Sequence, residues 1–403
     1  MNSPSYQGLF NDGKILINSI NALALFVVKK SASCRRYISA KYKYIFIDEY
    51  QDTSFDQHLV FLEIEKLNLI FTVVGDVNQS IYKWNNASPE YLLSFVKDYK
   101  FKEFKIFQNH RCHPSIYKYA NKFLGLSEED IEEEKKIFKI KLNDNNKSRY
   151  EKLDEIVEKI INSHKLEKNE IAIISRLNSA IEMYSKNTKH QYKIYLDNPL
   201  DKIGCKISLF CSDLIKYKFS KRISLYEIYQ RNNIIKNKIG LADFKNTFKD
   251  LREIEDSEKI CIKLQNFLES FFLKEDIELI LAASRTIFND KNFIKFYKPE
   301  DNNDIQMLNI HKSKGLEFKV VIHIGLEDKS FPLVTKLDNG WGVKDIQEEK
   351  NLHYVALTRA EKICLLVSMS KRVNSSFAEL ETVSSEFFNI DSLRGYIRDL
   401  GER

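Results

Sequence analysis

Residues 44–76 have the sequence YIFIDEYQDTSFDQHLVFLEIEKLNLIFTVVGD. The runs 44–47 and 69–74 are apolar and β-prone, and an acidic pair follows the first while glycine and aspartate follow the second. Neither run alternates apolar with polar side chains, which is typical of strands in a parallel sheet that has helices on both faces. Residues 53–66 have apolar side chains at helical spacing, and residues 52–54 supply candidate N-caps. The stretch therefore predicts a strand, a helix and a strand of an α/β fold, with both strands fully buried.

The rest of the chain repeats this pattern, with one purely helical interruption. Residues 215–295 are rich in Lys, Asn, Glu, Ile and Leu at helical spacing and predict a helical insertion. The last residues, 370–403, are expected to be helical. Further strands are predicted at 171–175, 305–310, 320–324 and 362–367, and further helices at 15–28, 114–124, 150–163 and 347–358.

Composition and charge limit the class of protein. Of 403 residues, 43% are apolar and 30% are charged, and the formal charge is +6, which excludes wholesale disorder and a small disulfide-stapled module. The longest wholly apolar run, residues 22–28, is far shorter than the roughly 20 residues that a membrane-crossing helix needs. The six cysteines form no C-x-x-C pair, so we expect buried or incidental thiols. We expect a soluble, cytoplasmic protein of roughly two to three domains.

Asp48 and Glu49 follow the first predicted strand, at the edge where α/β sheets bind their ligands. Such a pair of carboxylates suits nucleotide hydrolysis, because one can hold Mg²⁺ while the other orients or deprotonates the attacking water. The alternative is an acidic turn that caps the helix beginning near Thr53. These two residues alone do not decide between the two interpretations.

The segment VGDVNQSIYKW, residues 74–84, begins where the second strand ends. Gln79 in this position can sense a γ-phosphate. Tyr82 and Trp84 flank Lys83, and single-stranded nucleic acid stacks its bases on aromatic side chains of this kind. The alternative is that both rings belong to the hydrophobic core, which is the commoner fate of isolated aromatic residues.

Three further polar segments lie at predicted junctions of strands and helices: NHR at 109–111, HKSKGLEF at 311–318 and YVALTRA at 354–360. Arg111 and Arg359 could neutralise the charge that develops on a transferred phosphoryl group. The alternative is that each arginine forms a surface salt bridge or a helix cap, which contributes little stability.

Taken in order, DEYQDT (48–53), VGDVNQSIYKW, NHR, IHKSKGLEF (310–318) and YVALTRA resemble motifs II to VI of superfamily 1 helicases of the UvrD, Rep and PcrA type. EIAIISRLN at 170–178, NPLDK at 198–202 and the short helical insertion resemble in particular the UvrD-like helicase subunit of Gabija anti-phage defence systems.

The resemblance implies an ATP- and Mg²⁺-dependent DNA helicase or translocase. Asp48 would hold Mg²⁺, and Glu49 would be the catalytic base. Gln79 would contact the γ-phosphate and couple hydrolysis to DNA. Tyr82 and Trp84 would stack on the bases of the translocated strand.

The resemblance also implies roles for the later motifs. Arg111 and Arg359 would be catalytic arginines that contact the γ-phosphate. Glu317 would meet the ribose of the nucleotide, with Gly315 beside it among the nucleotide-binding residues. His110 stands where the family often has a tyrosine on the adenine, and His311 would lie near the DNA-coupling network.

The implied fold is a pair of tandem RecA-like parallel sheets of the P-loop NTPase type, the first of them incomplete. Residues 1–107 would form the partial first motor domain, residues 108–214 and 296–403 the second, and residues 215–295 a helical insertion in the second. The implied partners are single-stranded or partly duplex DNA, with 3′ to 5′ movement, and a nuclease subunit of a defence complex. No membrane is expected as a partner.

Some positions depart from the family pattern. Asn85 and Asn86 stand where the family usually has Arg-Gly, which removes a cation beside the base-stacking side chains. His110 offers a smaller ring than tyrosine. Asn351 stands where the family usually has an arginine, in the helix before YVALTRA. These changes affect the expected affinity and coupling and remove no essential group.

The largest departure from the family is at the start of the chain. The family begins with a glutamine-type adenine motif and a P-loop, G-x-x-x-x-G-K-[ST], whose amides and lysine hold phosphates. The nearest string, GLFNDGKI at 8–15, ends in Ile, and Lys14 lies only 34 residues before Asp48. It favours a turn before a helix over a P-loop.

We therefore expect a family member without the amino-terminal half of its first motor domain, one that hydrolyses ATP poorly on its own. The alternative is a catalytically dead module that binds DNA or a nuclease partner.

Overall fold

The computed structural model describes residues 19–126, 134–195, 198–299, 301–338, 340–374 and 376–402. The glycine string at 8–15 and the first residues of the helix predicted at 15–28 lie outside the described residues. The chain divides into two compact units. The first comprises Met1–His110, Ala120–Glu129 and Thr335–Thr358, and the second comprises Arg111–Tyr119, Asp130–Val334 and Arg359–Arg403.

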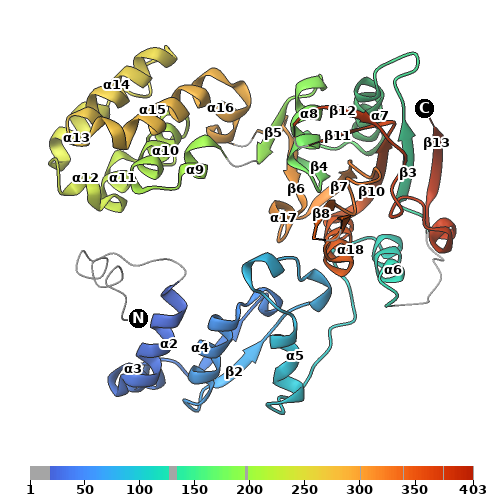
Figure 1. Cartoon of the computed structure of the whole chain (residues 1–403), viewed down its shortest axis with the longest axis horizontal. Helices are drawn as coiled ribbons and strands as arrows, with labels where there is room; N and C mark the ends of the chain where they lie inside the picture. Colours follow the sequence, from blue (N-terminus) through green and yellow to red (C-terminus); the bar gives the residue numbers. More distant parts are fainter. Residues whose placement is uncertain are drawn as a thin grey trace. The chain divides into compact units, whose positions relative to one another are not determined.

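The first unit contains the strand, helix and strand that the sequence predicts (Figure 1). β1 (Tyr44–Ile47) pairs in parallel with β2 (Ile70–Val73). Between them, α4 (Phe55–Glu65) begins at a capping box, in which the side chains of Ser54 and Gln57 each accept the backbone N–H of the other residue. The predicted helix at 53–66 and both strands are confirmed.

Short helices and one hairpin complete this unit. The turns η2 (Tyr50–Asp52), η3 (Val77–Gln79) and η4 (Lys83–Asn85) follow the two strands. The hairpin strands are β8 and β9, and most of β8 belongs to this unit. The other elements are α2 (Ile20–Lys30), α3 (Ala32–Lys41), α5 (Glu90–Lys97), β8 (Val334–Leu337), β9 (Gly340–Val343) and α18 (Ile346–Leu357).

The prediction that β1 and β2 are buried on both faces is wrong for the described residues. Tyr44, Phe46 and Ile70 are 53%, 71% and 50% exposed. Exposed side chains alternate along β1 with half-buried ones, so the described helices cover only one face of this two-stranded sheet. An apolar run indicates burial on both faces only where helices lie on both.

The second unit is built on a seven-stranded, wholly parallel sheet (Figure 1). The order across the sheet is β13-β3-β10-β7-β4-β6-β5. All four strands predicted in this region are confirmed, and the mixed α/β architecture is consistent with a RecA-like helicase fold. The strands are β3 (Ile137–Leu142), β4 (Ile171–Ser175), β5 (Tyr192–Tyr195), β6 (Ile305–Asn309), β7 (Phe318–His323), β10 (Ala360–Met369) and β13 (Arg398–Glu402).

Helices pack on this sheet through apolar side chains. α7 (Arg149–His164) and α8 (Asn178–Asn187) contribute Leu153, Val157 and Ile181 to one core with the strands. The remaining elements near the sheet are α6 (Pro114–Phe123), which runs from one unit into the other, η5 (Lys168–Glu170) and α17 (Ile310–Ser313). The predicted helices at 114–124, 150–163 and 347–358 are confirmed.

A run of helices within the second unit has a core of its own, and the predicted insertion at 215–295 lies inside this run. Phe248 packs edge-on against Phe267, with ring centroids 4.8 Å apart, and Phe244 lies 5.2 Å from Phe248. The helices are α9 (Pro199–Ile203), α10 (Lys206–Phe219), α11 (Leu225–Arg231), α12 (Asn233–Lys236), α13 (Leu241–Phe248), α14 (Ser257–Glu269), α15 (Lys274–Asn289) and α16 (Lys291–Tyr297).

The prediction of a helical carboxyl-terminal segment at 370–403 is wrong. β11 (Lys371–Val373) and β12 (Glu379–Glu381) form an antiparallel pair, η6 (Asp391–Tyr396) follows, and β13 joins the edge of the large sheet beside β3. β13 pairs with β3 in parallel, and opposite charges meet across this pair, with Lys139 Nζ 3.2 Å from the Asp399 carboxylate. A polar edge strand of this kind has no apolar pattern for sequence analysis to detect.

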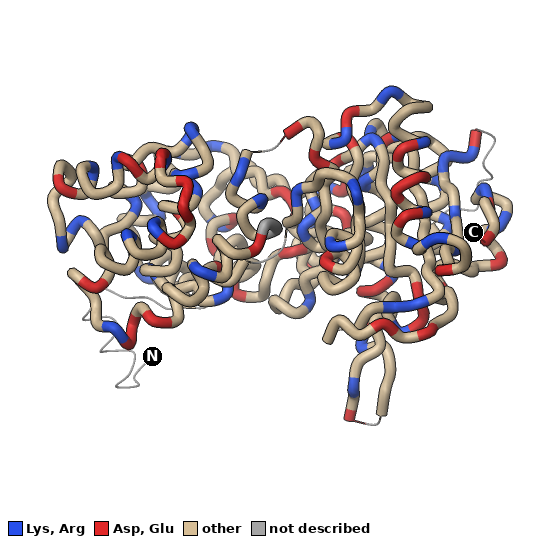
Figure 2. Tube along the Cα trace, turned by 90° about the horizontal axis from the view of Figure 1, so that it is seen from above, with Lys and Arg blue, Asp and Glu red and all other residues tan. Residues whose placement is uncertain are grey.

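Charged residues of both signs are spread along the chain. Figure 2 shows Lys and Arg interspersed with Asp and Glu along the trace, in keeping with a formal charge of +6. All six cysteines are free thiols. In the part of the chain that the structure describes, no helix is both long and apolar enough to cross a bilayer.

Candidate functional site

The acidic pair lies at the carboxyl end of β1, as predicted. Asp48 and Glu49 are both exposed, and Asp48 Oδ1 accepts the backbone N–H of Glu49 over 2.8 Å. Glu49 has a φ of 53°, in the left-handed region that residues other than glycine seldom adopt. Backbone of this kind costs free energy and clusters at functional sites.

Gln51 connects the ends of the two strands, and this residue was not among the predicted site residues. Its side chain is completely buried; Nε2 donates to Glu49 Oε2 over 2.5 Å, and Oε1 accepts the Asp76 N–H over 3.0 Å. Gly75 makes room for this contact, because a Cβ at that position would lie 2.4 Å from Gln51 Oε1. The only signal in the sequence is the position of Gln51 within DEYQDT.

Gln79 belongs to the same hydrogen-bonded cluster. Its Nε2 donates to Asp76 Oδ2 over 2.9 Å, while Asp76 Oδ1 accepts the backbone N–H of Asn78. The structure therefore joins Glu49, Gln51, Asp76 and Gln79 through successive hydrogen bonds.

Tyr82 and Trp84 continue from this cluster. Their ring centroids are 6.0 Å apart in an edge-on arrangement, and Trp84 is 71% exposed while Tyr82 is half-buried. Burial, followed by the negative charges of Asp52 and Glu49, raises the pKa of Tyr82 above its ordinary value. The core alternative is wrong for Trp84, whose indole is open to solvent.

The backbone conformation at position 86 explains why asparagine can stand there in place of the glycine of the family's Arg-Gly. Asn86 has a φ of 59° and ends η4 in the left-handed region. Glycine adopts this conformation freely, and asparagine is among the few other residues that tolerate it.

Two contacts join α18 to this aromatic segment within the first unit. Asn351 Nδ2 donates to the Ser80 carbonyl over 3.0 Å. The side-chain amide of Asn351 therefore makes a contact from the position where the family usually has an arginine. Lys83 Nζ lies 2.6 Å from Asp345 Oδ2 at the start of the helix. Burial acts to raise the pKa of Asp345. The hydrogen bond and positive charge of Lys83, together with the hydrogen bond from the Glu348 N–H, outweigh this effect and hold the pKa below its ordinary value.

The remaining predicted site residues are divided between the units. His110 is exposed at the end of the first unit's main segment, and the others lie in the second unit. There Arg111 Nε donates to Glu317 Oε2 over 2.8 Å, so the predicted phosphate arginine and the predicted ribose ligand contact each other. The same loop turns at Gly315, whose φ of 82° suits glycine.

Arg359 is almost wholly buried, with 1% of its surface exposed. Its guanidinium donates to the Leu316 carbonyl over 3.1 Å, and its own carbonyl accepts the Phe318 N–H. His311 lies on α17, whose first turn is capped by the Asn309 side chain. Arg359 therefore contacts the segment that contains Gly315 and Glu317.

The donor set at β1 fits a magnesium site of the single-carboxylate kind. Mg²⁺ prefers oxygen ligands and is usually held by one or two carboxylates together with water and substrate phosphates. Asp48 presents an exposed carboxylate with Glu49 next to it. Among the described residues, no group of three or more His, Cys, Asp and Glu side chains forms a closed metal cage.

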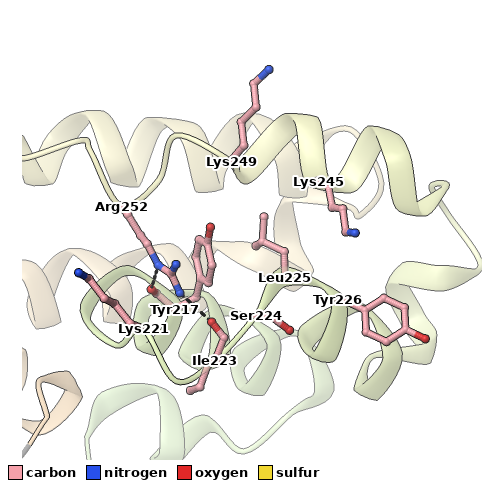
Figure 3. A pocket seen from close by; sticks show the side chains of 9 residues that line it. All are labelled: Tyr217, Lys221, Ile223, Ser224, Leu225, Tyr226, Lys245, Lys249 and Arg252. Atoms are coloured by element: carbon pink, nitrogen blue, oxygen red, sulfur yellow. Dashed lines mark hydrogen bonds between the residues drawn. The ribbon is translucent and has the colours of Figure 1, made fainter.

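A basic hollow of about 360 Å³ lies among the insertion helices (Figure 3). Lys221 and Arg252 lie at one end and Lys245 at the other. Arg252 stacks on Tyr217, 4.0 Å from the ring centroid, and donates to three backbone carbonyls. No carboxylate lines the hollow, and within the described residues its three lysines form no ion pair. The lining residues are Tyr217, Lys221, Ile223, Ser224, Leu225, Tyr226, Lys245, Lys249 and Arg252.

Two family models match the chain in the order of the motifs. The UvrD/REP helicase N-terminal domain matches residues 7–100, and the UvrD-like helicase C-terminal domain matches residues 231–372. The first contains the acidic pair and the aromatic segment, and the second contains His311 to Glu317 and Arg359.

Individual relatives agree with these models. The Gabija protein GajB of Bacillus cereus is 28% identical over 89% of this chain and 69% of its own length. The ATP-dependent DNA helicase Rep of Buchnera aphidicola subsp. Schizaphis graminum is 26% identical over 86% of this chain and 65% of its own length. The ATP-dependent DNA helicase PcrA of Staphylococcus aureus is 24% identical over 84% of this chain and 56% of its own length.

The chain thus spans less than two thirds of the length of these Rep and PcrA helicases and slightly more than two thirds of GajB. The two family models describe successive parts of one kind of helicase and together match more than half of the chain. The chain belongs to the UvrD-like family of superfamily 1 helicases.

Proposed function

We propose that this protein is the motor of an ATP-dependent DNA helicase or translocase that moves 3′ to 5′ along single-stranded DNA. The observation that carries the proposal is the cluster around Gln51. Gln51 joins Glu49 to Asp76, and Asp76 in turn binds Gln79. The candidate base and the candidate γ-phosphate sensor thus belong to one hydrogen-bonded group at the ends of two parallel strands.

Each side chain has a chemical task in this proposal. Asp48 would hold Mg²⁺, which neutralises phosphate charge when bound. Glu49, oriented by Gln51, would position the attacking water and accept its proton. Gln79 would donate to the γ-phosphate and exchange that contact for Asp76 as hydrolysis proceeds.

The proposed coupling to DNA runs through the segment that contains Gln79. Burial, and after it the negative charges of Asp52 and Glu49, raise the pKa of Tyr82. Trp84 presents an exposed indole two residues further on. A change in the Gln79 contact would therefore move the surface on which a base stacks. Base stacking on aromatic rings tolerates any sequence, as a translocating motor requires.

The basic hollow of the insertion would contact the DNA backbone. Three lysines without ion pairs among the described residues, together with Arg252, give it a positive charge that no lining carboxylate offsets. Contacts of this kind hold phosphates without reading sequence.

One observation favours the alternative of a DNA-binding module without hydrolysis, with a nuclease as its partner. Arg359 is buried and donates to the Leu316 carbonyl, whereas a catalytic arginine must reach the γ-phosphate. The similarity to GajB supports a role in an anti-phage defence complex under either proposal.

Binding and hydrolysis distinguish the two proposals. We expect the purified protein to bind a labelled oligothymidylate in a salt-sensitive way, and Trp84→Ala to weaken this binding about tenfold. We expect DNA-stimulated ATP hydrolysis, slow for the chain alone, to disappear in Glu49→Gln while DNA binding remains.

Tight DNA binding with hydrolysis equal in the wild type and Glu49→Gln would support the binding module. Absence of single-strand binding would contradict both proposals.

A further inference from the structure

The chain contains two tryptophans, and both are exposed in the first unit. Trp84 is 71% exposed and Trp341, on β9, is 76% exposed. Tryptophan is usually well buried, because its side chain removes 150–250 Å² from water in a core. The proposed function accounts for Trp84 and leaves Trp341 without a role.

One lysine precedes Trp341 in the hairpin and another follows it. Lys336 and Lys344 line a hollow of about 700 Å³ together with Thr335, Leu337 and the single carboxylate of Asp338. Neither lysine forms an ion pair within the described ranges. An exposed indole beside unpaired cations is the combination with which proteins bind single-stranded nucleic acid, the lysines on the backbone and the ring on a base.

Contacts within the first unit connect the segment after this hairpin to the segment that contains Trp84. Asp345, four residues after Trp341, forms the 2.6 Å ion pair with Lys83, the residue before Trp84. Asn351 adds a second contact, to the Ser80 carbonyl. With consecutive Cα atoms about 3.8 Å apart, this path allows no more than about 32 Å between the Cα atoms of the two tryptophans, and about 40 Å between their rings. One strand of DNA can span that distance, since single-strand sites cover roughly 4–16 nucleotides.

We propose that Trp341 is a second base-stacking residue, and that the hairpin β8–β9 extends the single-strand site that begins at Trp84. This proposal rests on the proposed function. It makes α18 the link between the two stacking rings, through the Lys83–Asp345 and Asn351–Ser80 contacts. A single strand that meets both indoles is then held over more nucleotides than Trp84 alone could hold.

Tryptophan fluorescence tests the proposal directly, because each single substitution leaves one fluorophore. In Trp84→Phe the remaining signal comes from Trp341, and in Trp341→Phe it comes from Trp84. We expect an oligothymidylate of about 20 nucleotides to quench both signals. We also expect Trp341→Ala to weaken binding about tenfold at low salt and Trp341→Phe, which keeps a ring, to restore most of the affinity.

Leu279→Ala is the matched control, because it removes an exposed apolar side chain from α15 and should leave the affinity unchanged. Quenching of Trp84 without quenching of Trp341 would overturn this proposal and leave the proposed function intact. Unchanged affinity in folded Trp341→Ala would also overturn it, and would assign the hairpin to a protein partner. Absence of quenching and of binding in all variants would contradict the proposed function itself.

Discussion

Nε2 of Gln51 donates to Oε2 of Glu49 over 2.5 Å. The other end of the same amide accepts the Asp76 N–H, so one buried side chain contacts the residues that follow both strands of the first unit. Gly75 allows this contact, since a Cβ there would lie 2.4 Å from Gln51 Oε1. The distance between the acidic pair and the Gln79 segment is therefore set by Gln51 and Gly75 together.

Substitutions at these two positions should be coupled. Gln51→Ala leaves the Asp76 N–H without its partner, a loss of about 1–3 kcal/mol of unfolding free energy. Gly75→Ala forces the Gln51 side chain to move, at a cost of about 1–3 kcal/mol. We expect the double variant to lose at least about 0.5 kcal/mol less than the sum, because the clash disappears with the amide.

Chemical denaturation of the four proteins measures this coupling. Part of the cost of Gly75→Ala should remain in the double variant, because the new Cβ would also lie 3.0 Å from the Leu92 side chain. Strictly additive free energies would show that Gln51 and Gly75 do not constrain each other.

Replacement of Asn86 by alanine should destabilise the protein, whereas replacement by glycine should not. Its φ of 59° lies in the left-handed region, where a Cβ without a polar side chain costs about 1–2 kcal/mol. Asn86→Ala should lower the unfolding free energy by about 1 kcal/mol, and Asn86→Gly should change it little. Thermal unfolding and oligothymidylate binding of both variants measure this, and equal stability of the two would contradict it.

The elements that the sequence predicts are those with a strong apolar pattern. The run at 171–175 becomes β4, which is buried throughout, because four apolar residues in succession suit the centre of a parallel sheet. The hairpin β8–β9 has no such run, and the apolar pattern predicts no strand there. β13 has a single large apolar residue, Leu400, and ion pairs with β3 accompany its backbone pairing.

The residues of the candidate site also differ in how well the sequence predicts them. Asp48 and Glu49 can be predicted because their chemistry is visible in the residue types, next to a recognisable strand. Gln51 carries no charge, and its bridging role exists only when two strands lie side by side. The contact between Arg111 and Glu317 joins residues 206 positions apart, so no local spacing could indicate it.

The basic hollow should determine part of the salt dependence of DNA binding. Lys245 and Lys249 lie on or just after α13 and line the hollow. Each lysine that contacts a phosphate contributes about one unit to the slope of log affinity against log salt concentration. Lys245→Gln combined with Lys249→Gln should therefore reduce this slope by about one to two units.

Lys259→Gln is the control for this prediction, because Lys259 is exposed on α14 and does not line the hollow. It should leave the slope close to the wild-type value. If the double variant and the control reduce the slope equally, the hollow is not a phosphate contact.

The second unit should lose stability as the pH rises, because of Glu327. This side chain is 3% exposed, and Oε1 accepts the Met369 N–H over 2.8 Å. Burial raises the pKa of Glu327 from its ordinary 4.5 to about 8, against the opposing effects of the Met369 N–H and the positive charge of Arg149. Between those two values the folded protein binds a proton that the unfolded chain releases.

Unfolding in this pH range therefore releases a proton. As the pH rises from 4.5 to 8, the unfolding free energy falls, by up to about 1.4 kcal/mol for each unit by which the pKa is shifted. Glu327→Gln keeps the Oε1 acceptor and cannot ionise, so its unfolding midpoint should match the wild type near pH 5 and exceed it above pH 8. Glu381→Gln, at an exposed position on β12, should show no such divergence. A constant difference between Glu327→Gln and the wild type across this range would mean that Glu327 is ionised in the folded protein at neutral pH.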